Sequence, residues 1–249
     1  MKTVKFLALC LAGVFGLYSC GSDDKDEKKE EKNKVYLVKS LTISEGGDHD
    51  KYTLVYENNR ITNITLVDSD GDTYAETFSY PSATSINCKS VDGEGVITMD
   101  ATGNVISKEE GTNFDGDTYK GVYSFIDGYL SKESWGENSY DTYTWLNGNL
   151  TSLKDTYVFE DGEGKEEHVT KIEYSDIENN TNIDFYLWLY SGANYAYTIQ
   201  FMKNVSKNIP SSVKSEYGAP VVISTTLDEK GRPSKMVYDG YTYTFEYYD

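Results

Sequence analysis

The sequence is poor in histidine and cysteine, and each shortage excludes a class of site. Two histidines in 249 residues leave little material for a histidine-rich metal centre. Three cysteines are too few for a disulfide framework. Lysine and arginine number 23 against 41 acidic residues, a formal net charge of −18, and so acidic a chain does not suit a nucleic-acid backbone. We therefore expect no metal centre, no cofactor and no nucleic acid among the partners.

Long hydrophobic runs are missing as well. The apolar stretch at 6–17 spans 12 residues, whereas a membrane-spanning helix needs about 20. Two lysines precede this stretch. The lysines and the apolar run together suit a secretory signal peptide over 1–19. The run ends in LYSC at 17–20, which resembles a bacterial lipobox and implies that Cys20 becomes an acylated N-terminus anchored in a lipid bilayer. An ordinary secreted protein with a chance cysteine is the alternative.

The residues after Cys20 are almost wholly polar. The stretch 21–34 reads GSDDKDEKKEEKNK, and a segment without large apolar side chains cannot form a core. We expect 20–34 to be a disordered acidic tether. Its acidic cluster resembles the surface-export signal of Bacteroidetes lipoproteins, which implies an outer-membrane protein exposed on the cell surface. A plain spacer that holds the protein on the periplasmic face is the alternative.

From 35 to 249 the sequence alternates between short strand-like stretches and turns. Aromatic or β-branched residues occur at about every second position, as in a strand with one buried face. Tyrosine, with 23 copies, supplies many of them. The stretches include KYTLVYE at 51–57, YKGVYSF at 119–125, YDTYTWL at 140–146, DTYVFED at 155–161 and YTYTFEYY at 241–248.

Turn signals separate these stretches. Asp-Gly and Asn-Gly favour tight hairpins because their residues tolerate positive φ. Few helix-length connections occur, so the strands should pair antiparallel. The tripeptide Asp-Thr-Tyr recurs at 72–74, 117–119, 141–143 and 155–157, and the units resemble tyrosine-rich repeats of the YD type. We expect one mainly β domain, 35–249, built as an antiparallel meander of repeated hairpins. The turn signals are Asn58-Asn59, Asp70-Gly71, Asp115-Gly116, Asp127-Gly128, Asn147-Gly148, Asp161-Gly162 and Asp239-Gly240.

One region, 179–210, is densely hydrophobic and does not alternate. The stretch 183–190 fits either a buried strand or a short helix. Asn182 is a suitable helix N-cap with Asp184 in the first turn, and Gly192 suits the end of a helix. A second short helix could cover 193–203. We expect one or two short helices within about 182–204 to plug the concave face of the sheet.

Several of these features occur together in a known family. They are the lipobox with its acidic tether, the tyrosine-rich hairpins, the TNID segment at 181–184, the SKNIPSSV segment at 206–213 and the closing pair at 221–249. Together they resemble an uncharacterised family of Bacteroidetes lipoproteins with a porin-like β fold. The resemblance implies a curved or barrel-like sheet and carries no functional residue. The outward polar side chains form no lipid-facing band, so we expect a tethered protein and not an inserted one.

Catalytic motifs are weak throughout. Cys88 lies in an alternating stretch, where a structural role is favoured over a nucleophile. His49 and His168 stand among acids and turn residues, outside any nucleophile motif. The acidic loop 68–72 departs from an EF-hand because its glycine falls at position 4 and Ser79 stands at position 12. An acidic turn is therefore favoured over a calcium loop. We expect no catalytic residue.

The aromatic residues are the better candidates for a site. Trp135, Tyr143, Trp145 and Trp188 could stack on a sugar ring, or they could serve only as cross-strand partners in the sheet. The leading hypothesis is a surface-anchored, non-catalytic lipoprotein that binds a glycan, a peptide or a membrane-protein partner. A hydrolase that uses acids in a concave pocket is the rival, and a stalk is a third class. Two carboxylates about 5–10 Å apart beside exposed aromatics would favour the hydrolase.

Overall fold

The computed structural model describes residues 34–90, 93–99, 107–112, 118–136, 138–159, 164–191 and 202–249. The chain divides into two units, Met1–Lys34 and Val35–Asp249, and the second contains the whole described core. The expected signal peptide, Cys20 and most of the expected tether lie outside the described residues. No helix within the described ranges is long and apolar enough to cross a membrane.

The first of two sheets contains nine antiparallel strands. Its order is β15-β16-β17-β1-β2-β3-β4-β5-β6, so the C-terminal strands join the N-terminal ones through the pairing of β17 with β1. The strands are β1 (Val38–Glu45), β2 (Asp48–Glu57), β3 (Arg60–Val67), β4 (Thr73–Ser82), β5 (Ser85–Ser90), β6 (Gly93–Thr98), β15 (Ser224–Leu227), β16 (Pro233–Tyr238) and β17 (Tyr241–Tyr247).

The second sheet contains eight antiparallel strands in the order β14-β13-β12-β11-β10-β9-β8-β7. Each strand pairs with its neighbour in the sequence, as a meander requires. The strands are β7 (Ser107–Thr112), β8 (Thr118–Ile126), β9 (Tyr129–Trp135), β10 (Ser139–Leu146), β11 (Asn149–Val158), β12 (Lys165–Glu178), β13 (Asn208–Ser215) and β14 (Val221–Val222).

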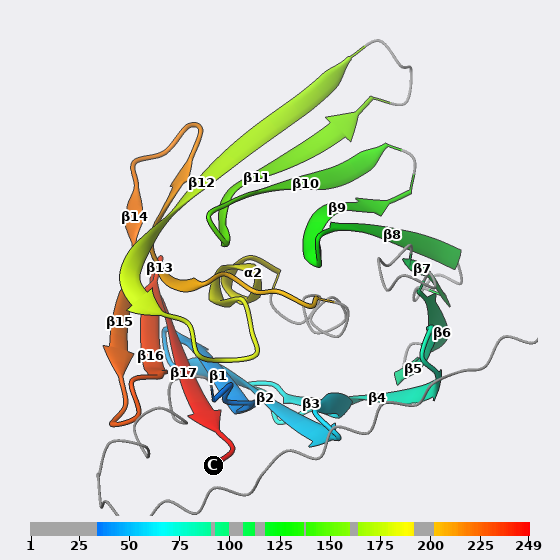
Figure 1. Ribbon diagram of the computed structural model, residues 1–249, viewed down its shortest axis with the longest axis horizontal. Coiled ribbons are helices and arrows are strands. Elements are labelled where there is room, and N and C mark those ends of the chain that lie inside the picture. The colour runs from blue at the N-terminus through cyan, green and yellow to red at the C-terminus, as the bar shows by residue number, and fades with distance from the viewer. Residues whose placement is uncertain are drawn as a thin grey trace, which may run out of the picture. The chain divides into compact units, whose positions relative to one another are not determined.

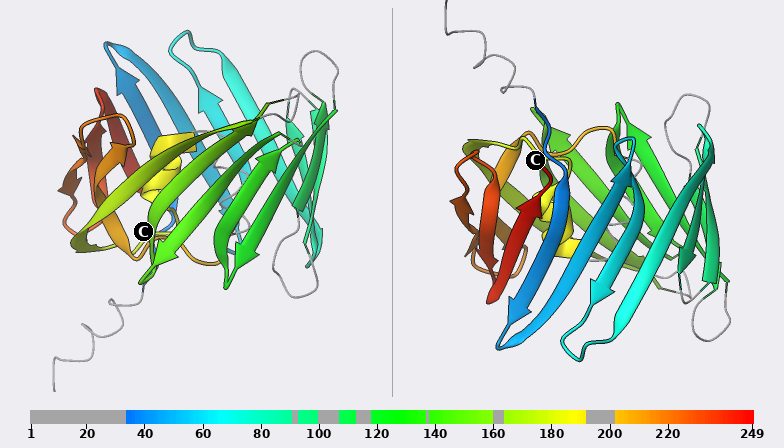
Figure 2. Two further views of the ribbon diagram at one scale, coloured as in Figure 1. Left: turned by 90° about the horizontal axis from the view of Figure 1, so that it is seen from above. Right: turned by 90° about the horizontal axis from the view of Figure 1, so that it is seen from below.

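Both sheets of the Val35–Asp249 unit curve around one short helix, α2 (Phe185–Ser191) (Figures 1 and 2). β6 lies beside β7, but no described hydrogen-bonded pairing joins the two sheets there or between β14 and β15. The expectation of a mainly β, antiparallel domain with a short helix inside is therefore confirmed. The described ladders do not close into one barrel.

Four of the expected turns have the backbone that a tight hairpin needs. Both central residues have positive φ at Asn58-Asn59, Asp127-Gly128, Asn147-Gly148 and Asp239-Gly240. This conformation matches the right-handed twist of the flanking strands, which explains the choice of Asn, Asp and Gly at these positions. The expected turns at 115–116 and 161–162 lie outside the described residues.

The acidic loop between β3 and β4 has a close counterpart between β15 and β16. The Asp68 carboxylate accepts the amide N–H groups two and four residues later, at 3.0 and 2.8 Å. The Asp228 carboxylate does the same, at 2.9 Å each. The second copy has Arg232 where the first has Asp72. The carboxylate at the first position therefore serves the turn, and the described residues contain no group of three side chains fit to hold a metal ion.

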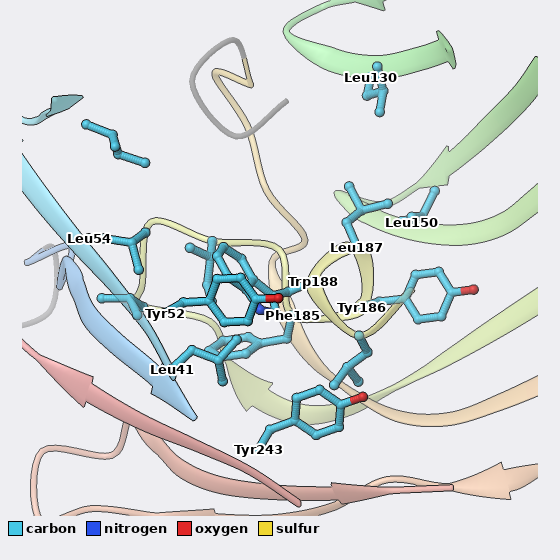
Figure 3. Packing of buried hydrophobic residues seen from close by; sticks show 14 of the residues in the cluster. Leu41, Tyr52, Leu54, Leu130, Leu150, Phe185, Tyr186, Leu187, Trp188 and Tyr243 are labelled. Atoms are coloured by element: carbon cyan, nitrogen blue, oxygen red, sulfur yellow. The ribbon is translucent and has the colours of Figure 1, made fainter. Parts of the chain in front are cut away.

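The helix α2 supplies the centre of the core. Phe185, Leu187 and Trp188 are each 1% exposed, and Phe185 meets Phe245 of β17 edge to face at 5.1 Å between ring centroids. Figure 3 shows Leu41, Tyr52 and Leu54 of the first sheet around these side chains. A helix surrounded by apolar side chains is hydrophobic all round, and so the stretch 183–190 shows no amphipathic period.

The N-cap of α2 is Asp184, so the prediction of Asn182 is wrong. The Asp184 Oδ1 atom accepts the amide N–H of Leu187 at 3.1 Å, and its Oδ2 atom accepts that of Ser206 at 2.8 Å. Asn182 instead ties the segment to the first sheet, because its Oδ1 accepts the amide N–H of Val38 at 3.0 Å. The expected second helix falls mostly on 193–201, outside the described residues, and 202–203 are not helical.

Candidate ligand pocket and carboxylate row

A pocket opens where β9 and β10 separate. The two strands pair only where 132–134 lie opposite 140–142, and they diverge toward the turns at their other ends. The resulting cavity has a volume of about 410 Å³, within the range of small-molecule sites. It is lined by Ile126, Asp127, Tyr129, Ser131, Tyr143, Thr144, Trp145 and Gly148.

Two aromatic rings form one wall of this pocket. The rings of Tyr129 and Trp145 lie 4.6 Å apart between centroids and are tilted by 39°. The Trp145 Nε1–H donates a hydrogen bond of 2.6 Å to the Leu130 carbonyl oxygen, across the gap between the strands. A register shift opposite Thr144 and Trp145 inserts one extra residue, Thr151, in the neighbouring strand β11. Trp145 is half-buried, so part of its indole faces the pocket.

The segment 203–207, just before β13, holds the two hairpin turns that border the pocket, 127–128 and 147–148. The amide N–H groups of Lys203 and Asn204 both donate to the Gly128 carbonyl oxygen, at 3.3 and 3.2 Å. The amide N–H of Lys207 donates to the Gly148 carbonyl oxygen at 2.9 Å. Gly128 has φ of +82°, and a Cβ atom there would lie 2.9 Å from Asn204 Nδ2. Glycine is therefore required both by the turn and by the close approach.

Tyr143 connects the pocket to an acidic group inside the fold. Its ring lines the pocket, and its hydroxyl donates a hydrogen bond of 2.9 Å to Glu133 Oε2. Burial and the Glu133 carboxylate raise the pKa of Tyr143, so the hydroxyl remains a donor at neutral pH. The position of this pocket wall therefore depends on a carboxylate of the neighbouring strand.

Glu133, Asp141 and Asp155 form a row across three strands, which we call the carboxylate row. Asp141 of β10 lies directly opposite Glu133 of β9 and Asp155 of β11. The row shares one sheet face with the buried Tyr143 and Leu153, which we call the inner face. Tyr190 of α2 lies near enough to interact electrostatically with Asp141.

Like charges meet in this row, and His168 of β12 lies directly opposite Asp155 at one end of it. Burial, and then the nearby Asp155 and Glu133 carboxylates, raise the pKa of Asp141 to about 7. The alternation of the described strands β9–β12 places their lysines on the opposite face, where Lys154 bonds to Glu167 at 3.0 Å. Asp141 therefore holds a proton at higher pH than an exposed aspartate does.

The structure brings only part of the expected site together. Tyr143 and Trp145 share the pocket. Trp188 is 1% exposed and meets Tyr52 edge to face at 6.0 Å, so it cannot act as an exposed platform. The side chain of Trp135 is not among those that the structure describes. Tyr129 was not predicted as a site residue, although its place after the Asp127-Gly128 turn put it opposite Ile126 in a hairpin.

The other candidates have structural surroundings. Cys88 is 6% exposed in β5, opposite Phe78, in agreement with the structural interpretation. His168 lies opposite Asp155, and its Nε2 atom is 3.2 Å from Glu166 Oε1. His49 is exposed near the start of β2, opposite Ser44.

The comparisons with known proteins concern the fold. No protein-family model and no curated protein matches the sequence. A solved porin-like protein from Bacteroides uniformis ATCC 8492 has a TM-score of 0.65 at 14% identity, and the match covers 85% of this chain and 98% of that one. A porin-like protein from Bacteroides vulgatus ATCC 8482 has a TM-score of 0.58 at 14% identity, with coverage of 86% and 99%. The chain therefore shares the β fold of porin-like proteins from Bacteroides.

Proposed function

We propose that the protein is a non-catalytic, lipid-anchored binding protein of the outer membrane that takes a sugar ring of a glycan into the pocket between β9 and β10. The Tyr129 and Trp145 wall carries this proposal, because aromatic rings offer an apolar face to a sugar ring. The hydroxyls of Ser131 and Thr144 line the same cavity and can bond to sugar hydroxyls.

The proposed lipid anchor and cell-surface location rest on the sequence. The lipobox at 17–20 supports acylation of Cys20, and the acidic tether supports exposure on the cell surface. Labelling cells with a fatty-acid analogue tests the anchor, because Cys20→Ser should abolish the label. The curvature of the two sheets around α2 supports a barrel-like arrangement for the domain.

The carboxylate row bears on the rival hydrolase hypothesis. A glycoside hydrolase places its two carboxyl groups at least about 5 Å apart, so that they flank the scissile bond. Asp141 and Asp155 instead lie directly opposite each other on paired strands, and Glu133 is buried and accepts the Tyr143 hydroxyl, so this row does not flank a space for a substrate. Their geometry supports a binding role over glycoside hydrolysis.

The test is a glycan array with the Val35–Asp249 unit. We expect binding that is lost in Trp145→Ala and in Thr144→Trp, which fills the cavity from an exposed position. The second variant is needed because Trp145 also holds β9 and β10 together. Tyr157→Ala removes a 44% exposed aromatic outside the pocket and is the matched control. No glycan binding by the unchanged unit would refute the sugar ligand, and binding retained by both pocket variants would refute the pocket.

A further inference from the structure

We propose that the outer face of the second sheet, around Lys132, Lys171 and Lys214, lies against an anionic lipid surface and so orients the anchored domain on its membrane. This inference rests on the proposed anchor at Cys20, because the anchor brings the domain to the membrane. The partner is defined by the phosphate charges of its headgroups, and the contact requires no particular lipid.

The strand register gathers five lysines on one face, which we call the lysine face. Lys132 of β9 and Lys154 of β11 lie opposite the same residue of β10. Lys171 of β12 lies opposite Lys214 of β13 on one side and opposite Ser152, two residues before Lys154, on the other. Paired residues and alternate residues of a strand share a face, so these side chains point away from the inner face. The lysine face consists of Lys132, Lys154, Lys165, Lys171 and Lys214.

The acids on this face do not balance its lysines. In the paired stretches of β9–β13, the register places only Glu167 and Glu173 beside them. Glu167 bonds to both Lys154 and Lys165, at 3.0 and 2.8 Å, and Glu173 accepts the Ser212 hydroxyl at 2.9 Å. The face is therefore positively charged, although the chain as a whole has a formal net charge of −18.

Two of these lysines lie directly opposite each other. Lys171 and Lys214 are both exposed, and like charges at such paired positions destabilise a sheet. In the described part of the chain, no carboxylate forms an ion pair with either ammonium group or with that of Lys132, whose Nζ lies 4.1 Å from the centre of the Tyr140 ring. A phosphate group between Lys171 and Lys214 would replace this repulsion with attraction.

The lysine face is open and lies within reach of the proposed anchor. Figure 1 shows α2 on the inner side of β9–β12 and no other described element over their outer side. The 14 residues at 21–34 span at most about 50 Å when fully extended, which keeps the domain at a high local concentration near the headgroups. Screening limits charge interactions to about 8 Å at physiological ionic strength. The face nearest the membrane, and not the net charge of the chain, therefore decides the orientation.

The experiment is cosedimentation of the chain 21–249, which lacks the acylated cysteine and retains the whole described core, with lipid vesicles. At low salt we expect binding to vesicles of phosphatidylglycerol and phosphatidylcholine in equal parts, and little binding to pure phosphatidylcholine. The combined variant Lys132→Gln, Lys171→Gln and Lys214→Gln should weaken binding at least about tenfold, because each lysine near an anionic surface contributes about fivefold.

A second combined variant is the matched control. Lys39→Gln, Lys51→Gln and Lys235→Gln remove the same charge from exposed positions of β1, β2 and β16 in the first sheet. Binding to the anionic vesicles should change by less than about twofold, since these lysines lie outside the lysine face.

Several results would overturn the proposal. They are the absence of binding to the anionic vesicles, binding that persists without Lys132, Lys171 and Lys214, and equal losses in the two combined variants. Binding to soluble polygalacturonate but not to vesicles would assign the face to an acidic polysaccharide and would also overturn the membrane contact. The chain 21–249 carries no lipid, so none of these outcomes depends on acylation of Cys20, which the fatty-acid label tests separately.

Discussion

Asp184 is a charged residue type at the centre of an apolar core. Its side chain is fully buried, and burial raises the pKa of its carboxyl. Its two carboxyl oxygens accept the amide N–H groups of Leu187 in the first turn of α2 and of Ser206. One side chain thus fixes both the start of the helix and the segment that leads to the pocket turns.

We expect Asp184→Ala to lower the free energy of unfolding by about 3 kcal/mol, because it removes a helix cap and leaves buried N–H groups without an acceptor. Asp184→Asn should cost clearly less, since asparagine caps helices as well as aspartate does. Urea denaturation measures both changes. Asp176→Ala, at an exposed position of β12, is the control, and equal losses for Ala and Asn would contradict the capping role.

The sequence could not distinguish Asp184 from Asn182 as the cap. Both residue types cap helices, and they stand two positions apart. Asn182 is engaged by Val38 and by the Tyr56 hydroxyl, contacts that join residues more than 100 positions apart. The sequence also could not distinguish a tryptophan that lines a pocket from one in the core. Trp145 and Trp188 look alike in sequence, and only the position of α2 between the sheets makes one a pocket wall and the other a core residue.

The two five-residue turns at 68–72 and 228–232 form one element used twice. Each turn also closes with a backbone hydrogen bond from its first amide to its last carbonyl, at 3.1 Å in the first copy and 2.8 Å in the second. The second copy adds an ion pair, since Arg232 Nε donates to Asp228 Oδ2 at 2.7 Å. That guanidinium lies over the rings of Tyr36 and Tyr247, at 4.6 and 4.4 Å from their centroids.

We therefore expect Asp228→Ala to destabilise the protein more than Asp68→Ala, by about 3 against about 1 kcal/mol. The difference arises because Arg232 is buried and would lose its carboxylate partner. Thermal or urea unfolding measures both. Asp228→Asn keeps the turn acceptor and should fall between the two. Equal effects of the two alanine variants would show that the ion pair adds nothing to the turn.

Hairpin positions were largely predictable at this level, and the carboxylate row was not. Asn147-Gly148 and Asp239-Gly240 mark their turns in the sequence itself, because these residue types tolerate the positive φ that a tight turn needs. Glu133, Asp141 and Asp155 come together only through the register of three strands. The shift between Thr144 and Trp145 changes the pairing of β10 with β11, and the sequence carries no clear sign of it.

Within the Val35–Asp249 unit, the last strand completes the pairing of the first. β1 is hydrogen-bonded to β2 on one side and to β17 on the other. Tyr36, just before β1, also forms a bridge to Thr181 near α2. Contacts this distant in sequence are costly to close, and so the fold has a high contact order. The sequence predicted strands and their antiparallel sense, and the family resemblance implied a curved or barrel-like sheet, but neither predicted the division into two sheets.

Removal of 241–249 should therefore abolish cooperative unfolding of the domain. The truncation deletes β17 with the buried Tyr243 and Phe245, and it leaves β1 and β16 with open edges. Calorimetry should show no sharp transition, and a dye that binds exposed apolar surface should become fluorescent. A chain that lacks 1–33 is the control and should melt as the full domain does. A sharp transition in the truncated chain would contradict the closing role of β17.

The pairing of Val38 with Tyr247 also sets an order for folding. About 200 residues separate these partners, so β1 emerges well before β17 from a chain that is made or exported from its N-terminus. During that interval one edge of β1 has no partner within its own chain, and an open strand edge is a template for pairing with a neighbouring chain. A chaperone that covers 38–45 until β17 is available would therefore protect this edge from aggregation.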